Sequence, residues 1–157
     1  MNVREVTPDI AADPWLVGAQ FIDAYRVEIG GKHLGAREAA QRMFARPPRW
    51  VDALLRLRNL IVAPLGLKTS GAGDSAASDL IGIFPVVSET PRRLVAGFND
   101  SHLDFRVVID VAPADAGQQV TATTLVRTHN RFGRAYLATI MPFHRLITRA
   151  LLRQVAP

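Results

Sequence analysis

The chain has 157 residues, of which 48% are hydrophobic and 21% are charged, and its formal net charge is +5. This length and composition are typical of one globular domain and exclude a fibrous repeat or wholesale disorder. No run reaches the roughly 18 uncharged apolar residues of a membrane span, and the first residues do not resemble a secretory leader. We therefore expect a single domain over residues 1–157 of a cytoplasmic protein without integral membrane contact.

Residue types that bind metal ions or act as nucleophiles are scarce. There is no cysteine, which excludes disulfides, thiolate metal ligands and a cysteine nucleophile. Neither glycine fingerprint for phosphate binding occurs, and no histidine pair has the short spacing of a zinc site. We expect no metal and no cofactor. The four histidines are His33, His102, His129 and His144.

Arginine accounts for 17 of the 19 basic residues. Arginine suits phosphate and nucleic-acid contacts. Here, however, the arginines are scattered, and no helix-turn-helix, zinc-finger or aromatic RNA-binding motif accompanies them. The pattern favours a solvated basic surface and no nucleic-acid partner.

The N-terminal third begins with a segment that has little hydrophobic periodicity. Residues 1–18 contain two prolines and little periodicity, which predicts a loose arm. Residues 19–29 then alternate and predict the first strand. Its apolar face carries Phe21 and Tyr25, and between them a carboxylate, Asp23. Asp23 and Tyr25 are two residues apart, so their side chains point to the same face.

Two helices and a loop are expected next. Residues 36–46 predict a short helix, and residues 47–66 predict a second one with proline in its first turn. Residues 66–79 are small, polar and glycine-rich, which indicates a flexible loop or lid. A stripe at helical spacing gives the second helix an inward face, namely Trp50, Leu54, Leu57 and Ile61.

The following residues are typical of an antiparallel meander. Four β-branched or alternating runs are separated by turn residues, and they cover residues 80–89, 92–98, 102–112 and 118–129. One sheet face is expected to be buried and the other wet. On the wet face, His102, Asp104 and Arg106 could form a polar relay, although a solvated salt-bridge ladder is the favoured interpretation.

The last segment, residues 133–155, is strongly amphipathic. It predicts a continuous helix kinked at Pro142, with a strand ending at residue 141 and a helix starting at Pro142 as the alternative. His144 lies at the margin of the apolar stripe. At 100° per residue the inward arc contains Tyr136, Ile140, Phe143, Ile147, Ala150 and Leu151, and the opposite, solvated side contains Arg145, Arg149 and Arg153.

These elements predict an α+β two-layer fold of the helix-grip type. A sheet and a helix that each have one apolar face bury those faces against one another. In the helix-grip arrangement a curved antiparallel sheet wraps around the long C-terminal helix, with two short helices after the first strand and a cavity between sheet and helix.

Four segments also carry a resemblance to a known family: "DAYRVEI", "ARPPRWVDALLRLRNLI", "VVSETPRRLVAGFNDSHLDFRVVI" and "TLVRTHNRFGRAYLATIMPFHRLI". Over about residues 15–155 the chain resembles the bacterial domain of unknown function 2867 (DUF2867). That family is similar to the SRPBCC superfamily of polyketide cyclases, START domains and pollen allergens. The resemblance implies a helix-grip fold whose cavity holds a hydrophobic or amphipathic small molecule. Some members of the superfamily are enzymes such as cyclases or hydratases.

Eight side chains are candidates to contact such a molecule: Asp23, Tyr25, Trp50, Phe98, Tyr136, Ile140, Phe143 and His144. A carboxylate or imidazole beside a cavity can act as general base, so a cyclase-like or hydratase-like enzyme using Asp23 or His144 is one alternative. Structural roles are the other interpretation, with both polar groups satisfied by neighbours and the aromatic residues packed in the core. A non-catalytic interaction module or a homodimer is a third alternative.

Overall fold

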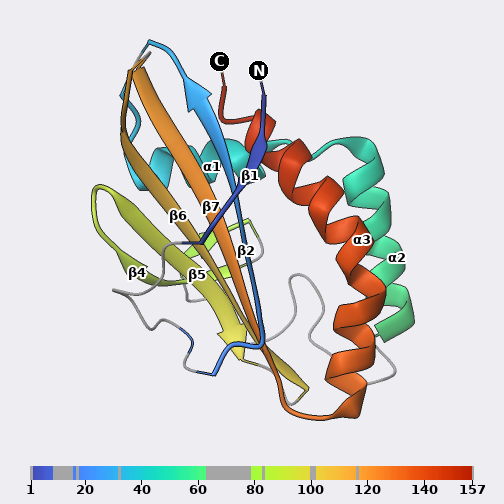
Figure 1. Ribbon diagram of the computed structural model, residues 1–157. Coiled ribbons are helices and arrows are strands. Elements are labelled where there is room, and N and C mark those ends of the chain that lie inside the picture. Colours follow the sequence, from blue (N-terminus) through green and yellow to red (C-terminus); the bar gives the residue numbers. More distant parts are fainter. Residues whose placement is uncertain are drawn as a thin grey trace.

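The computed structural model describes residues 2–8, 16, 18–31, 33–62, 79–82, 84–99, 102–115 and 117–156. Their strands form one sheet in the order β1-β2-β7-β6-β5-β4-β3, with every neighbouring pair antiparallel. Helices cover one face of it (Figure 1). The elements are β1 (Arg4–Val6), β2 (Phe21–Ile29), α1 (Ala36–Ala45), α2 (Arg49–Val62), β3 (Leu80–Ile81), β4 (Phe84–Glu89), β5 (Arg93–Asn99), β6 (Leu103–Ala114), β7 (Gly117–Thr128) and α3 (Arg131–Arg153).

This architecture confirms the predicted α+β fold of helix-grip type, because the long C-terminal helix packs on β2 and β7. The four predicted runs form strands, and the first of them divides into β3 and β4 at Gly82. Gly82 has a φ of +61°, which glycine adopts without strain. The loop predicted over residues 66–79 lies outside the described residues, except for Asp79.

The N-terminal segment corrects the expectation of a loose arm. Residues 4–6 form the edge strand β1, in which Glu5 lies opposite Tyr25 of β2. Val3 is buried and belongs to the main core. A strand of three residues is too short to produce a recognisable alternation, so the sequence pattern could not predict it.

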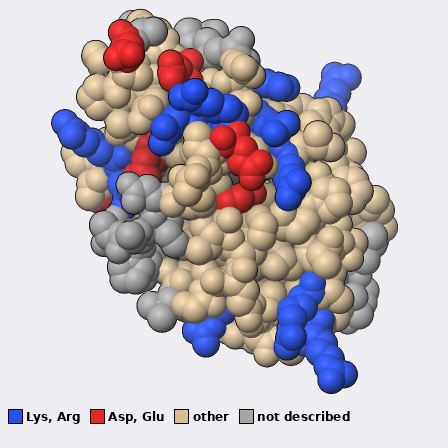
Figure 2. Space-filling model, in the orientation of Figure 1, with Lys and Arg blue, Asp and Glu red and all other residues tan. Residues whose placement is uncertain are grey.

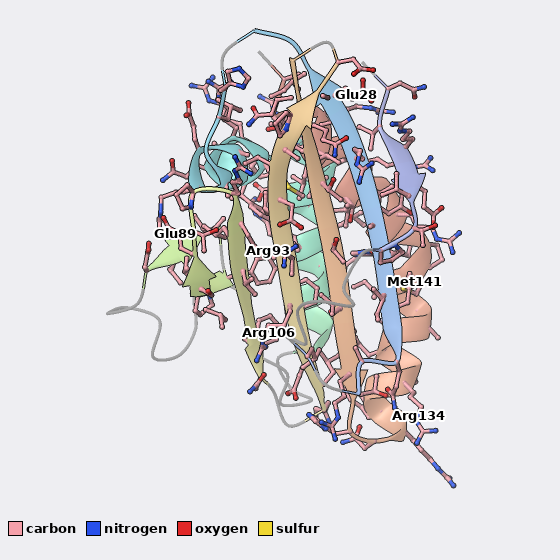
Figure 3. The ribbon with its side chains drawn as sticks, turned by 60° about the vertical axis from the view of Figure 1, so that its left-hand side comes forward. Glu28, Glu89, Arg93, Arg106, Arg134 and Met141 are labelled. Carbon is pink, nitrogen blue, oxygen red and sulfur yellow. The ribbon has the colours of Figure 1, made fainter. Side chains whose placement is uncertain are left out.

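The outer face of the sheet is less uniformly wet than expected. Val95, Val108 and Leu125 are buried there, and three partly buried residues pack against them, Leu16, Ala19 and Ile22. Ala24 is buried on this face too, and polar residues occupy other positions of the face. Figure 3 shows it in front of the helices, with Arg93 and Arg106 on it. The Arg93 guanidinium pairs with Asp110 at 2.5 Å.

The helix-covered face, which we call the inner face, carries the main core. α1 packs on β5 and β6, and it presents small residues to them, which lets its backbone lie close to the strands. Gln118 of β7 joins the loop before α1 to the sheet. Its amide Oε1 accepts from the Leu34 N–H at 2.9 Å, and its Nε2 donates to the Leu34 carbonyl at 2.7 Å.

The predicted inward stripe of the second helix is wrong in part. Trp50 is 44% exposed and Leu57 is 52% exposed, whereas Val51 is 1% exposed. The side chain of Ile61 lies outside the described residues. Leu54 and its neighbour Leu55 are both half-buried. A helix with apolar residues on several sides has no single stripe, so periodicity alone could not choose the side that Val51 buries.

α3 confirms the continuous helix, with Pro142 inside it. Its buried face, however, is centred on Thr148 and Leu152 and includes Gly133. Phe143, expected inside, is 45% exposed. Arg149, expected to be solvated, is half-buried over Tyr25. The predicted arc was right at Leu151, which is buried, and at Ile147, which packs against the core. It was wrong at Phe143, and it missed Gly133 and Thr148 because it counted only apolar residues.

Arg37 connects α1 to the edge of the sheet, and this contact gives a prediction for acid pH. Its Nε donates to Glu89 at 2.8 Å, and its Nη1 donates to Asp79 at 3.2 Å. This pairing lowers the pKa of both carboxyl groups. In Arg37→Gln both pKa values should rise to about 4, the ordinary value, as measured by NMR titration of the carboxyl carbons.

The sign of the pH effect follows from that lowering. Because both folded-state pKa values are depressed, the pairing stabilises the protein above the ordinary carboxyl range and is lost as pH falls through the folded values. The difference in stability between wild type and Arg37→Gln should therefore be present at neutral pH and vanish in acid. A difference that persists in acid would contradict this account.

Candidate functional site

Asp23 and His144 meet between β2 and α3. His144 Nε2 lies 3.3 Å from Asp23 Oδ1 and 3.2 Å from Oδ2. Asp23 is 7% exposed, and the His144 side chain keeps 18% exposure. The ring of Phe21 meets the imidazole edge-on, with the two ring centres 5.9 Å apart. The two polar residues that stood out on apolar faces of the sequence are therefore in contact.

This contact determines which imidazole nitrogen is available for a ligand. With Asp23 ionised and the imidazole neutral, the proton belongs on Nε2, which faces the carboxylate, so that Nδ1 keeps its lone pair. The Thr148 hydroxyl also lies 3.5 Å from Nε2. Within the described parts of the chain, Nδ1 has no hydrogen-bond partner. The pair can thus present a hydrogen-bond acceptor, or a base, on a ring whose side chain keeps 18% exposure.

Tyr25 and Arg149 lie two residues further along β2 and one turn further along α3. Tyr25 is fully buried, and the Arg149 guanidinium carbon lies 5.4 Å from the centre of its ring. Burial raises the pKa of Tyr25, and the charges of Asp23 and Glu5 raise it further, while Arg149 and Arg145 oppose them. The phenol therefore stays protonated at neutral pH.

Buried polar atoms without partners gather at this place. Among the described residues, four side chains have such an atom, and three of them are Asp23, Tyr25 and Arg149. Native proteins leave few buried polar groups unpaired, so each one asks for an explanation. Their grouping around the Asp23–His144 contact makes this place the candidate site.

Tyr25→Phe provides a test of this interpretation. Because the Tyr25 hydroxyl is buried without a partner, its removal should raise the free energy of unfolding, by about 1 kcal/mol. Urea unfolding of both proteins measures the difference. A loss of stability of similar size would show that the hydroxyl is hydrogen-bonded in solution. The matched control is Tyr136→Phe, which makes the same change at a half-buried position of α3.

A row of apolar side chains leads away from Asp23 and His144 across the inner face. We call it the phenylalanine floor and define it as Phe21, Val126, Phe105, Phe98 and Phe84. Neighbours in the first four positions are paired across β2, β7, β6 and β5. The Phe84 ring stacks on Phe105 and Phe98, with ring centres 5.0 and 6.0 Å apart. All four phenylalanines are only half-buried.

The predicted site residues thus separate into three groups. Asp23, Tyr25 and His144 come together, and Phe98 lies at the other end of the floor that begins beside them. Tyr136 and Ile140 are half-buried on α3. The two remaining candidates, Trp50 and Phe143, are exposed at 44% and 45%.

Sequence reasoning did not select Arg149, Thr148, Phe21 or Phe105 for this site. Phe21 and Phe105 were placed on the correct face, and their position beside Asp23 and Phe98 was the available signal. Arg149 gave no signal, because an arginine in an amphipathic helix is ordinarily solvated.

His102, Asp104 and Arg106 do not form a relay. The His102 ring nitrogen Nδ1 contacts the amide of Asn130 at 2.9 Å, while Asp104 lies 3.0 Å from Nε2 of His129. Arg106 donates to the main-chain carbonyls of Phe98 and Phe105. Each group has a separate structural partner, which favours the structural interpretation. The Asp104–His129 contact serves below as a control for Asp23–His144.

The charged surface and α2 offer no comparable site. On the face drawn in Figure 2, basic side chains are interspersed with acidic and uncharged ones and form no continuous basic patch among the residues described. A surface hollow of about 510 Å³ lies along α2, lined by Arg49, Asp52, Ala53 and Arg56. It is lined by none of the predicted site residues.

In the described helices, no stretch is both long and apolar enough to cross a membrane.

No curated protein is detectably similar to the chain. A solved structure from Mesorhizobium loti is similar at 14% identity and a TM-score of 0.42, covering 86% of this chain and 96% of that one. One from Rhodobacter sphaeroides has 13% identity and a TM-score of 0.41, covering 98% and 95%. The family model described as protein of unknown function (DUF2867) matches residues 15–151.

Proposed function

The chain belongs to the DUF2867 family, and because that family has no assigned activity we propose a function from the site itself. The protein binds a hydrophobic or amphipathic small molecule between the inner face of its sheet and α3. One observation carries the proposal: the half-buried phenylalanine floor ends at a group of buried polar atoms without partners. A cytoplasmic location and kinship with the SRPBCC superfamily are part of this proposal.

The chemistry of the site supports this function. Small-molecule sites are mostly apolar and contain a few polar groups that orient the ligand. Phe84, Phe98 and Phe105 offer stacked rings, on which a flat or aliphatic body gains both area burial and aromatic contact. Asp23 and His144 lie at the other end of the floor, next to Phe21. A ligand with an apolar body and one polar end matches this order of residues.

Binding of the aromatic probe 2-naphthol tests the proposal. Phe98→Ala should weaken its binding about tenfold, because it removes one stacked ring from the floor. Titration calorimetry measures the two dissociation constants. Phe132→Ala is the matched control, since Phe132 packs on His102 rather than on the floor, and it should leave binding unchanged. Equal losses in both variants, or no binding to wild type, would contradict the proposal.

A second candidate is a cyclase-like or hydratase-like enzyme with His144 as general base. The Asp23–His144 contact favours it, since a carboxylate that holds one imidazole nitrogen leaves the other free to accept a proton. Asp23 then acts as the positioning residue. For any amphipathic substrate that is turned over, Asp23→Asn should lower kcat, and unchanged turnover would refute this role.

A third candidate is a non-catalytic interaction module, in the simplest case a homodimer. It is favoured by large apolar side chains exposed on two helices, which are Trp50, Leu57 and Leu60 of α2 and Phe143 and Leu146 of α3. Sedimentation velocity at increasing protein concentration tests it, and a species that stays monomeric would remove it.

A further inference from the structure

We propose that the polar end of the bound molecule is an uncharged hydrogen-bond donor, such as an alcohol or phenol hydroxyl, and not a carboxylate. This inference rests on the proposed function and concerns the chemical class of the ligand. It follows from the hydrogen-bonding capacity that remains available at the Asp23–His144 end of the phenylalanine floor.

The groups that Asp23 and His144 leave available at the Phe21 end of the floor are acceptors, whereas the donors of Tyr25 and Arg149 lie further along β2 and α3. With Asp23 ionised and the imidazole neutral, His144 donates its Nε2 proton to Asp23, whose two carboxylate oxygens lie 3.2 and 3.3 Å away. Its Nδ1 is then a lone-pair acceptor on a ring that keeps 18% exposure. The Asp23 oxygen Oδ2 is buried and makes no hydrogen bond among the described residues, although it lies 3.2 Å from His144 Nε2. A ligand hydroxyl supplies the proton that these acceptors lack.

The local charge disfavours an acid. Asp23 is buried at 7% exposure, where water screens its charge poorly, so that a carboxylate ligand beside Phe21 would meet a like charge. The charged groups on neighbouring elements that act on Tyr25, two residues from Asp23, are Arg145 and Arg149 on α3 and Glu5 on β1. Their charges therefore have to be weighed against that of Asp23.

Geometry places Arg149 away from the Phe21 end of the floor, and Arg145, next to His144, is exposed to solvent, which screens its charge. Phe21, the first member of the floor, and Tyr25 are four residues apart on β2, or about 13 Å along the strand. His144 and Arg149 are five residues apart on α3 and project about 140° apart around its axis. His144 packs on Phe21, whereas Arg149 packs on Tyr25. Asp23 and His144 consequently determine the polarity at the Phe21 end.

Three probes of one shape test the inference. At pH 8, binding of 2-naphthol, 2-naphthoate and 2-methylnaphthalene is measured by titration calorimetry. We expect 2-naphthol to bind at least tenfold more tightly than 2-naphthoate, with 2-methylnaphthalene between them. Tighter or equal binding of 2-naphthoate would overturn the inference and leave the proposed function standing. Binding of none of the three would overturn both.

Two matched variants assign the effect to Asp23. Asp23→Asn keeps the shape of the side chain and removes its charge, so the preference for 2-naphthol should fall below threefold. Asp104→Asn makes the same change in the other Asp–His contact, which lies outside the floor, and should keep the full preference. An undiminished preference in a folded Asp23→Asn protein would overturn the inference. The comparison of the three probes on the wild-type protein tests the inference even if neither variant folds.

Discussion

Gly133→Ala is expected to lower the free energy of unfolding by about 3 kcal/mol, at the upper end of the usual cost of overpacking. Gly133 lies in the first turn of α3, and a Cβ atom there would be 2.2 Å from the main-chain oxygen of His102. Neither backbone can yield without moving the helix away from the start of β6. At an exposed helix position, the same change would raise the free energy of unfolding by about 1 kcal/mol. The contact with His102 therefore reverses the sign of the expected effect on stability.

Thermal unfolding measures this effect, and for a chain of this size a loss of about 3 kcal/mol corresponds to a fall of about 6–12 °C in Tm. The control is Thr139→Ala, at an exposed position of the same helix, which should change Tm little. A Gly133→Ala protein as stable as wild type would show that α3 does not pack closely on the His102 carbonyl. The position of His144 over Asp23 depends on that packing.

Gln118→Leu should cost about 4 kcal/mol. The Gln118 side chain is 6% exposed, and its amide makes two hydrogen bonds with the main chain of Leu34. Leucine has a similar size but leaves a buried N–H and a buried carbonyl unpaired, each at a cost of about 1–3 kcal/mol. Loss of these bonds should also release the loop that precedes α1.

Urea unfolding measures the cost, and hydrogen exchange at the Leu34 amide reports the local change. Gln119→Leu is the matched control, because Gln119 is the next residue of β7 and lies half-buried on the opposite face. It should alter stability by less than about 0.5 kcal/mol. If both variants lose the same stability, the two hydrogen bonds of Gln118 are not responsible.

The sheet and the last helix could be predicted from sequence because their patterns are long. β2 and β6 are nine and twelve residues long, and the large side chains at every second position predict their inner faces. The helical period continues through Pro142, and the structure keeps one helix there. Where the pattern is short, as in β1, or apolar on several sides, as in α2, the inward side depends on packing against distant segments.

The candidate site was predictable where a polar residue stood on an otherwise apolar face. Asp23 on an apolar strand face and His144 beside an apolar stripe were both noticeable, and they contact each other. Arg149 could not be selected, because its role depends on the position of Tyr25 under α3. The phenylalanine floor required the register between strands, which pairs Phe98 with Phe105, Phe105 with Val126, and Val126 with Phe21 at the start of β2.

The most direct test of the central claim is an NMR titration of methyl-labelled protein with 2-naphthol. Binding on the inner face predicts shifts of the methyl groups of Val126, in the floor, and Ile140, on α3. The buried methyl groups of the outer face should stay unchanged, and these belong to Val95, Val108 and Leu125. Shifts confined to the outer face, or no shifts at saturating probe, would contradict the proposed site.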